Sequence, residues 1–255
     1  MKLKIPQNKQ TLYRIPAVLC WLLVWQGAAL LLHQPLLLSS PLQVVRRLFA
    51  FLTQSSFYRA LCFSMLRIFG GCVAGMLLGA ALAVLSGCCR AAEYLLHPLM
   101  TCVKSVPVAS FIILALVWLS SRRLNAFIAF LMVLPIVYGS VLEGLHARDP
   151  KLHEMACVYH IPWMRRFLYI DLPQLKPYLY SASSLAVGMS WKAGIAAEVI
   201  GIPSGSIGEM LYQSKIYLDM SALYAWTLVI VLLSMAYERL VLYLLRRGFV
   251  RLESL

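Results

Sequence analysis

The chain has 255 residues, of which 61% are hydrophobic and only 13% charged, with a mean hydropathy of +0.78. A soluble core of this length would not hide so much apolar surface, since average soluble domains carry about 25% charged residues. The net charge of +13 does not indicate nucleic acid, because the lysines and arginines lie in short clusters between apolar stretches. The composition therefore predicts an all-α integral membrane protein, surrounded by lipid and without a nucleic-acid partner.

The N-terminal segment is basic and is followed by an apolar run from Ile15 to Leu32. This is the charge order of a signal peptide, but a clear small-x-small cleavage site is missing and the apolar run is longer than usual. We interpret the run as a retained first membrane span. The next segment, Pro41 to Arg67, has arginines among apolar residues, which suits an interfacial helix leading into the second span.

Several apolar stretches approach the roughly 20 residues needed to cross a bilayer. We predict six membrane helices, at about 15–33, 66–87, 99–119, 125–144, 178–200 and 222–245. Pro107 should kink the third helix near one end, because it removes a backbone donor.

Small residues recur every four positions in the predicted second span. They are Gly71, Gly75, Gly79, Ala83 and Gly87. Such a stripe predicts a helix-packing face that another helix can approach closely.

The distribution of basic residues sets the expected orientation. With a cytoplasmic N-terminus, most of the 23 lysines and arginines fall on the inner side. This predicts a multi-pass protein of the plasma membrane with both termini in the cytoplasm. It also places residues 145–177, between the fourth and fifth spans, on the cytoplasmic side.

The 145–177 loop contains the charged stretch HEMACVYHIPWMRRFLYIDLP, His153 to Pro173. We predict one short helix at Leu152–Tyr159, a turn at His160 and Ile161, and a second helix with Pro162 in its first turn. This second helix should end before Pro173. The predicted hairpin presents apolar side chains beside two arginines, as a docking surface for a soluble partner would. Those side chains are Met155, Val158, Trp163, Phe167 and Leu168.

This loop resembles the cytoplasmic loop of permease subunits in binding-protein-dependent ABC importers. Their pattern is EAA, three residues, G, nine residues, I-x-LP, and the matching positions here are Glu154, Met155, Ala156, His160, Ile170, Leu172 and Pro173. Met155 replaces the middle alanine. His160 replaces the glycine of the turn, which leaves the turn shifted or slightly strained.

Two further segments are similar to the sulfonate, nitrate and taurine group of these permeases. They are KSVPVASFIILALVWL at 104–119 and MSWKAGIAAEVIG at 189–201. The resemblance covers roughly residues 65–245. We therefore divide the chain into an N-terminal span with an interfacial segment, 1–64, and a permease core, 65–255.

The resemblance implies a coupling loop that docks on a separate ATPase subunit. The chain has no G-x-x-x-x-G-K-[ST] phosphate loop, so it is not expected to be an enzyme or to bind a cofactor, and ATP and Mg belong to the partner. The implied assembly has two ATP-binding subunits, two identical copies of this permease and an extracytoplasmic substrate-binding protein. It imports a small solute of the sulfonate, nitrate, taurine or vitamin-precursor type by ATP-driven alternating access, and Lys192 favours an anion.

Three residues of the fifth span are candidates for the substrate path: Trp191, Lys192 and Glu198. A charge at a helix centre costs roughly 2.5–3.5 kcal/mol on insertion scales, so it should avoid lipid. Lys192 either faces an anionic solute, or pairs with another group or snorkels to an interface. Glu198 either contacts the solute or has a structural role in closing the outer gate. No cluster of residues predicts a metal site.

Two alternatives to an importer subunit stay open at this stage. A stand-alone carrier or channel would have internal repeats and a relay of buried carboxylates. A membrane-embedded enzyme would need a nucleophile with a base, and Ser190 near Lys192 is thin support. Only an importer permease predicts a stoichiometric ATPase bound through residues 150–173.

Overall fold

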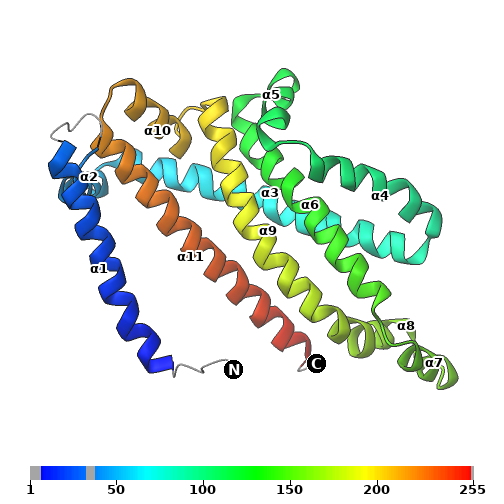
Figure 1. Ribbon diagram of the computed structural model, residues 1–255. Helices are drawn as coiled ribbons and strands as arrows, with labels where there is room; N and C mark the ends of the chain where they lie inside the picture. The colour runs from blue at the N-terminus through cyan, green and yellow to red at the C-terminus, as the bar shows by residue number, and fades with distance from the viewer. Residues whose placement is uncertain (1–6, 33–37, 254–255) are drawn as a thin grey trace. The chain divides into compact units, whose positions relative to one another are not determined.

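The computed structural model describes residues 7–32 and 38–253, and every regular element in these residues is a helix (Figure 1). In chain order the elements are α1 (Gln7–Leu32), α2 (Pro41–Leu52), α3 (Ser55–Cys88), α4 (Arg90–Ser105), α5 (Val108–Trp118), α6 (Ser121–His146), α7 (Pro150–Val158), α8 (Trp163–Arg166), the π-helical turn η1 (Phe167–Asp171), α9 (Leu172–Gly201), α10 (Ile207–Ile216) and α11 (Met220–Glu253). The predicted all-α class is confirmed for this part of the chain.

Three of the described helices are long and apolar enough to cross a membrane: α3, α6 and the Met220–Gly248 part of α11. The pair α4 and α5 makes a fourth candidate if the two are one broken span. Helix α1 contributes only a shorter apolar stretch, Leu19–Leu32. Helix α9 has 30 residues but is less apolar, because serines, Lys192 and Glu198 interrupt it. The structure thus supports three or four spans, and the number six stays a prediction.

The expected third span bends at Pro107, as predicted, but the bend is a complete break of the helix. Helix α4 ends at Ser105, α5 begins at Val108, and the two are bent by 105°. Val106 has extended backbone angles, φ −78° and ψ 132°, as the residue before a proline prefers. Pro107 is the N-cap residue of α5 and offers no N–H to continue α4. Both restrictions act at one point, so the helix breaks there.

The chain divides into two compact units. The first contains the residues up to Tyr58 together with Met210–Ile230, and the second contains Arg59–Glu209 together with Val231–Leu255. The expected division between residues 64 and 65 stays a prediction. The first unit is made of two separate stretches of the chain, because it includes Met210–Ile230, whereas the expected division had one boundary.

The first unit is held by aromatic packing. The ring centroids of Phe51, Phe57 and Trp226 lie 5.0–6.1 Å apart.

Helix α2 begins at a capping box, in which Ser40 accepts a hydrogen bond from the Gln43 N–H and Gln43 accepts one from the Ser40 N–H. The expected interfacial segment 41–67 is therefore not one helix, because α2 ends at Leu52 and α3 begins at Ser55.

In the second unit, α3 packs on α6, and α6 runs beside α9 (Figure 1). A Cβ added at Gly75 would lie 2.8 Å from the Phe130 carbonyl oxygen, and one at Gly79 would lie 2.7 Å from that of Leu134. At Gly71 the Ala126 carbonyl leaves no space for a Cβ. The three glycines face the α6 backbone, at a distance that only glycine permits.

Candidate functional site

The loop between α6 and α9 begins with α7, which ends in a Schellman motif. The His160 N–H donates to the Cys157 carbonyl at 3.1 Å, and the Ile161 N–H donates to the Ala156 carbonyl at 2.9 Å. His160 has φ +49°, in the left-handed region that favours glycine. The turn is therefore not shifted: it lies at the position of the motif's glycine, and His160 adopts the left-handed backbone conformation usual for glycine.

The second half of the loop corrects a sequence prediction. We expected a helix that ends before Pro173, but α8, η1 and α9 follow one unbroken helical path through this proline. The Leu172 N–H reaches back to the Phe167 carbonyl, as in a π-helical turn. Pro173 follows this wider turn directly and offers no N–H to the preceding helical residues, so the helix continues with one backbone hydrogen bond missing. Residues 163–201 are therefore helical throughout.

An ion pair fixes the base of the loop. Asp171 is buried and accepts from Arg148 Nη1 at 3.0 Å, with Arg166 Nε 3.8 Å away. The Asp149 N–H donates to Gln174 Oε1 at 2.9 Å, which joins the start of α7 to the start of α9. These contacts bind the two ends of the loop together across some twenty residues of chain.

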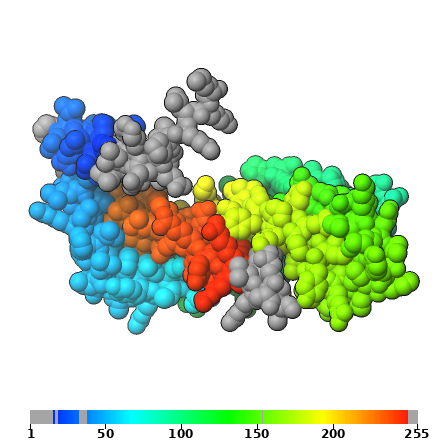
Figure 2. All heavy atoms as spheres, turned by 90° about the horizontal axis from the view of Figure 1, so that it is seen from below, coloured from blue at the N-terminus to red at the C-terminus, as the bar shows by residue number. Residues whose placement is uncertain are grey.

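The outer surface of the loop is apolar and exposed. Val158, Tyr159 and Trp163 are each 70–74% exposed. Figure 2, which views the molecule from below, shows this green to yellow-green part of the chain facing the viewer at the right.

The seven predicted coupling residues differ in exposure. Glu154, Met155, His160 and Pro173 are exposed, Ile170 and Leu172 are half-buried, and Ala156 is buried. Glu154 also lines a hollow of about 320 Å³ between α7 and the start of α9.

The three substrate-path candidates do not form one site. Trp191 is buried, and its ring centroid lies 5.7 Å from that of Tyr237. Lys192, the next residue of α9, is exposed, whereas Glu198 is fully buried near the C-terminal end of the helix. Of the three, Lys192 has the exposure that contact with a passing solute requires.

Glu198 is the centre of a buried polar cluster. It accepts from Asn125 Nδ2 at 2.6 Å, from Ser64 Oγ at 2.8 Å and from the Gly208 N–H at 3.1 Å. Ser64 Oγ also accepts from the Ile207 N–H at 3.1 Å. A Cβ at Gly208 would collide with Glu198, so glycine lets α10 approach this closely. The cluster joins α3, α6, α9 and the start of α10.

Sequence reasoning missed two further features of the membrane helices. The Nζ atom of Lys104 lies beside Gly139 on α6, 3.1 Å from where a Cβ would stand. Directly after Gly139 along the chain, Ser140 and Glu143 of α6 line a hollow of about 390 Å³ together with Pro177, Tyr178 and Ser181 of α9. The signal in the sequence was a polar or charged residue at a position inside an expected span. The sequence did not show which residues of other helices lie beside it.

Residues 71–249 match the family described as binding-protein-dependent transport system inner membrane component. The matched range includes the loop, the glycine face and all three substrate-path candidates. The chain belongs to this family. It is an ABC importer permease, a membrane protein of the transport class, and the predicted resemblance is confirmed.

Curated relatives of this permease family extend over most of the chain. It is 24% identical over 218 residues to the putative aliphatic sulfonates transport permease protein SsuC of Bacillus subtilis, covering 84% of this chain and 78% of that protein. It is 23% identical over 245 residues to the taurine transport system permease protein TauC of Escherichia coli, covering 93% and 89%. The bicarbonate transport system permease protein CmpB of Synechococcus elongatus is 25% identical over 146 residues, covering 57% and 52%.

Proposed function

We propose that this permease forms, with a second copy of itself, the membrane path of an ATP-driven importer. The main observation in support of this proposal is the exposed apolar surface of the 145–177 loop, whose base is held by an ion pair. Trp163, Tyr159 and Val158 are among the most exposed large side chains of the second unit, while the Arg148–Asp171 pair holds the loop base. Exposed aromatic residues on a pre-ordered element are typical of a protein-binding surface.

The partner at this surface is an ATPase subunit, present in two copies, that binds ATP and Mg. The uninterrupted helical path from α8 through η1 to the end of α9 supports a mechanical role. Helix α9 alone has 30 residues, which is about 45 Å at 1.5 Å per residue. A displacement of the docked loop is therefore passed to α9, which carries the exposed Lys192, because loop and helix are joined without an intervening coil.

The solute is a small anion delivered by an extracytoplasmic binding protein. The relatives named for aliphatic sulfonates, taurine and bicarbonate support this class. Lys192 and Lys104 are exposed on helices α9 and α4, and each offers an ammonium group to an anion in a water-filled path. Both termini lie in the cytoplasm in this arrangement, on the same side as the ATPase.

The test is co-purification of the tagged permease in mild detergent, followed by mass spectrometry. The wild type should retain a nucleotide-binding subunit, and Glu154→Arg should lower its yield at least about ten-fold by placing a like charge among the loop arginines. Glu93→Arg makes the same charge change on α4. It removes a 3.7 Å contact with His146 but leaves residues 150–173 unchanged, and it should retain the subunit.

A wild-type permease that purifies alone and moves a solute into liposomes without ATP would contradict the proposal. The stand-alone carrier would then be the better interpretation.

A further inference from the structure

Helix α2, in the first unit, has three distinct sides. At 100° per residue, the buried Val44 and Phe51 lie on one side. A second side is apolar but 41–65% exposed, and it consists of Leu42, Val45, Phe49 and Leu52. The third side is polar, with Gln43, Arg46 and Arg47. A helix with an uncovered apolar side next to a basic side is typical of an element lying in the membrane interface.

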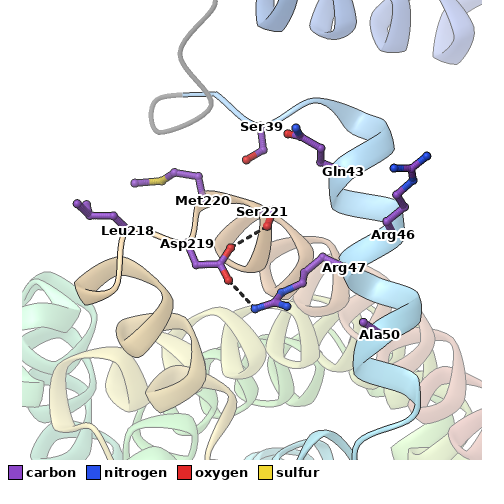
Figure 3. A pocket seen from close by; sticks show the side chains of 9 residues that line it. All are labelled: Ser39, Gln43, Arg46, Arg47, Ala50, Leu218, Asp219, Met220 and Ser221. Carbon is purple, nitrogen blue, oxygen red and sulfur yellow. Dashed lines mark hydrogen bonds and ion pairs between the residues drawn. The ribbon is translucent and has the colours of Figure 1, made fainter.

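The polar side of α2 borders a hollow of about 510 Å³ (Figure 3). The lining residues from α2 and the chain before it are Ser39, Gln43, Arg46, Arg47 and Ala50, and those around the start of α11 are Leu218, Asp219, Met220 and Ser221. All of these belong to the first unit.

One of the two arginines in this hollow is already neutralised. Arg47 Nη2 donates to Asp219 Oδ2 at 2.6 Å. Partial burial raises the pKa of Asp219, but hydrogen bonds from the Ser221 hydroxyl and the Ala222 N–H and the charge of Arg47 outweigh it. The pKa is therefore below its ordinary value, and Asp219 stays ionised as the partner of Arg47.

The other arginine has no such partner. Among the residues that the structure describes, Arg46 makes no hydrogen bond or ion pair, and its side chain is exposed. Figure 3 shows it extending from α2 away from the Arg47–Asp219 pair. On the helix, Arg46 lies between the hollow and the exposed apolar side, next to Leu42 in angle. A free guanidinium thus stands at the border between an uncovered apolar surface and a polar hollow.

We propose that Arg46, at the rim of this hollow, binds the phosphate of an anionic phospholipid headgroup. One lipid can contact both the apolar side of α2 and the charged residue beside it. Its acyl chains cover Leu42, Val45 and Phe49, while its phosphate pairs with the Arg46 guanidinium. A soluble acidic partner would meet the charge but leave the apolar side uncovered. Free inorganic phosphate would do the same, so the lipid is the occupant that fits the whole surface.

The experiment uses the purified, delipidated importer complex in mild detergent. Thermal unfolding is followed after adding phosphatidylglycerol, phosphatidylcholine or inorganic phosphate, for wild type, Arg46→Gln and Arg46→Lys. Phosphatidylglycerol should raise the Tm of the wild type by about 2–4 °C more than phosphatidylcholine does. Arg46→Gln should remove this difference, with about five-fold weaker lipid binding in native mass spectrometry, and Arg46→Lys should keep part of it.

The matched control is Arg123→Gln, which removes an exposed guanidinium from the start of α6 and should behave as wild type. Equal effects of the two lipids, or an Arg46→Gln variant with an undiminished phosphatidylglycerol effect, would overturn the proposal. So would inorganic phosphate that reproduces the whole shift, since the ligand would then be a free oxyanion.

Discussion

Helix α9 carries a buried carboxylate at each end, and the two are held in different ways. Asp171, just before its first residue, is paired with the cations Arg148 and Arg166 and lies under an exposed loop. Among the described residues, the hydrogen-bond donors to Glu198, in the last turn of α9, are the neutral groups of Asn125, Ser64 and the Gly208 N–H.

The difference follows from the surroundings of each end. Long arginine side chains can reach Asp171 while part of the guanidinium stays in water, so the pair loses little hydration. Glu198 lies among closely packed helices and accepts from short side chains and a backbone N–H on the neighbouring elements. The loop end of α9 is therefore suited to partner contact, while the Glu198 end ties four elements together.

The strongest test of this contrast is Glu198→Ala. It leaves three buried donors without an acceptor, so we expect a loss of about 3–5 kcal/mol in the free energy of unfolding. Glu198→Gln keeps one carbonyl oxygen and should lose only about 1–2 kcal/mol. Thermal unfolding in detergent measures both. An unchanged Tm together with lost transport would show that Glu198 acts on the solute and does not hold the helices.

The cluster also depends on the close approach of α3 and α6. Gly75→Ala should destabilise the protein by about 1–3 kcal/mol, because the new Cβ meets the Phe130 carbonyl oxygen. Gly70→Ala is the matched control, since a Cβ there has no neighbour within 4 Å. That variant should gain roughly 0.5–1 kcal/mol from helix propensity. Equal Tm values for the two variants would contradict the packing interpretation.

At the loop end, the expected effect is on binding and not on folding. Trp163→Ala should weaken ATPase binding by about 2 kcal/mol while leaving the Tm unchanged, because 70% of the side chain is exposed. Trp118→Ala, at the end of α5 and 79% exposed, should change neither quantity. Titration of the ATPase subunit onto each variant measures the affinity. A lower Tm for Trp163→Ala would mean that this residue supports the loop itself.

The smallest expected effect concerns the turn of the loop. His160→Gly should raise the free energy of unfolding by about 0.5–1 kcal/mol, because glycine adopts φ +49° without the strain of a side chain. His160→Ala should give no such gain, since alanine meets the same restriction. A destabilised glycine variant would show that the imidazole makes contacts that outweigh the backbone strain.

Much of the loop was predictable because its determinants are local. Pro162 and the residues around His160 fix two helical segments with a turn between them, and the motif spacing pointed to the permease family. The same local reasoning failed at Pro173, where a π-helical turn lets the helix continue. It also underestimated Pro107, where two neighbouring backbone restrictions break the helix completely.

The partners of the membrane residues were not predictable in the same way. Trp191 was a candidate for the substrate path, and Glu198 for either solute contact or a structural role. Their partners in the structure, Tyr237 for Trp191 and Asn125, Ser64 and Gly208 for Glu198, had no signal in the sequence. Helical periodicity gives the direction of a side chain around its own helix, but it does not say which other helix lies there.

The sequence by itself determined that this is a helical membrane permease with an ordered loop, because hydropathy, proline positions and motif spacing act over a few residues. Only the tertiary structure decided that Ser64, Asn125 and Gly208 meet at Glu198, and that Met210–Ile230 belongs with the first fifty-eight residues. Such meetings depend on which helices are neighbours in space. Which helices become neighbours is decided by the packing of the whole chain, and it cannot be read from any short segment of the sequence.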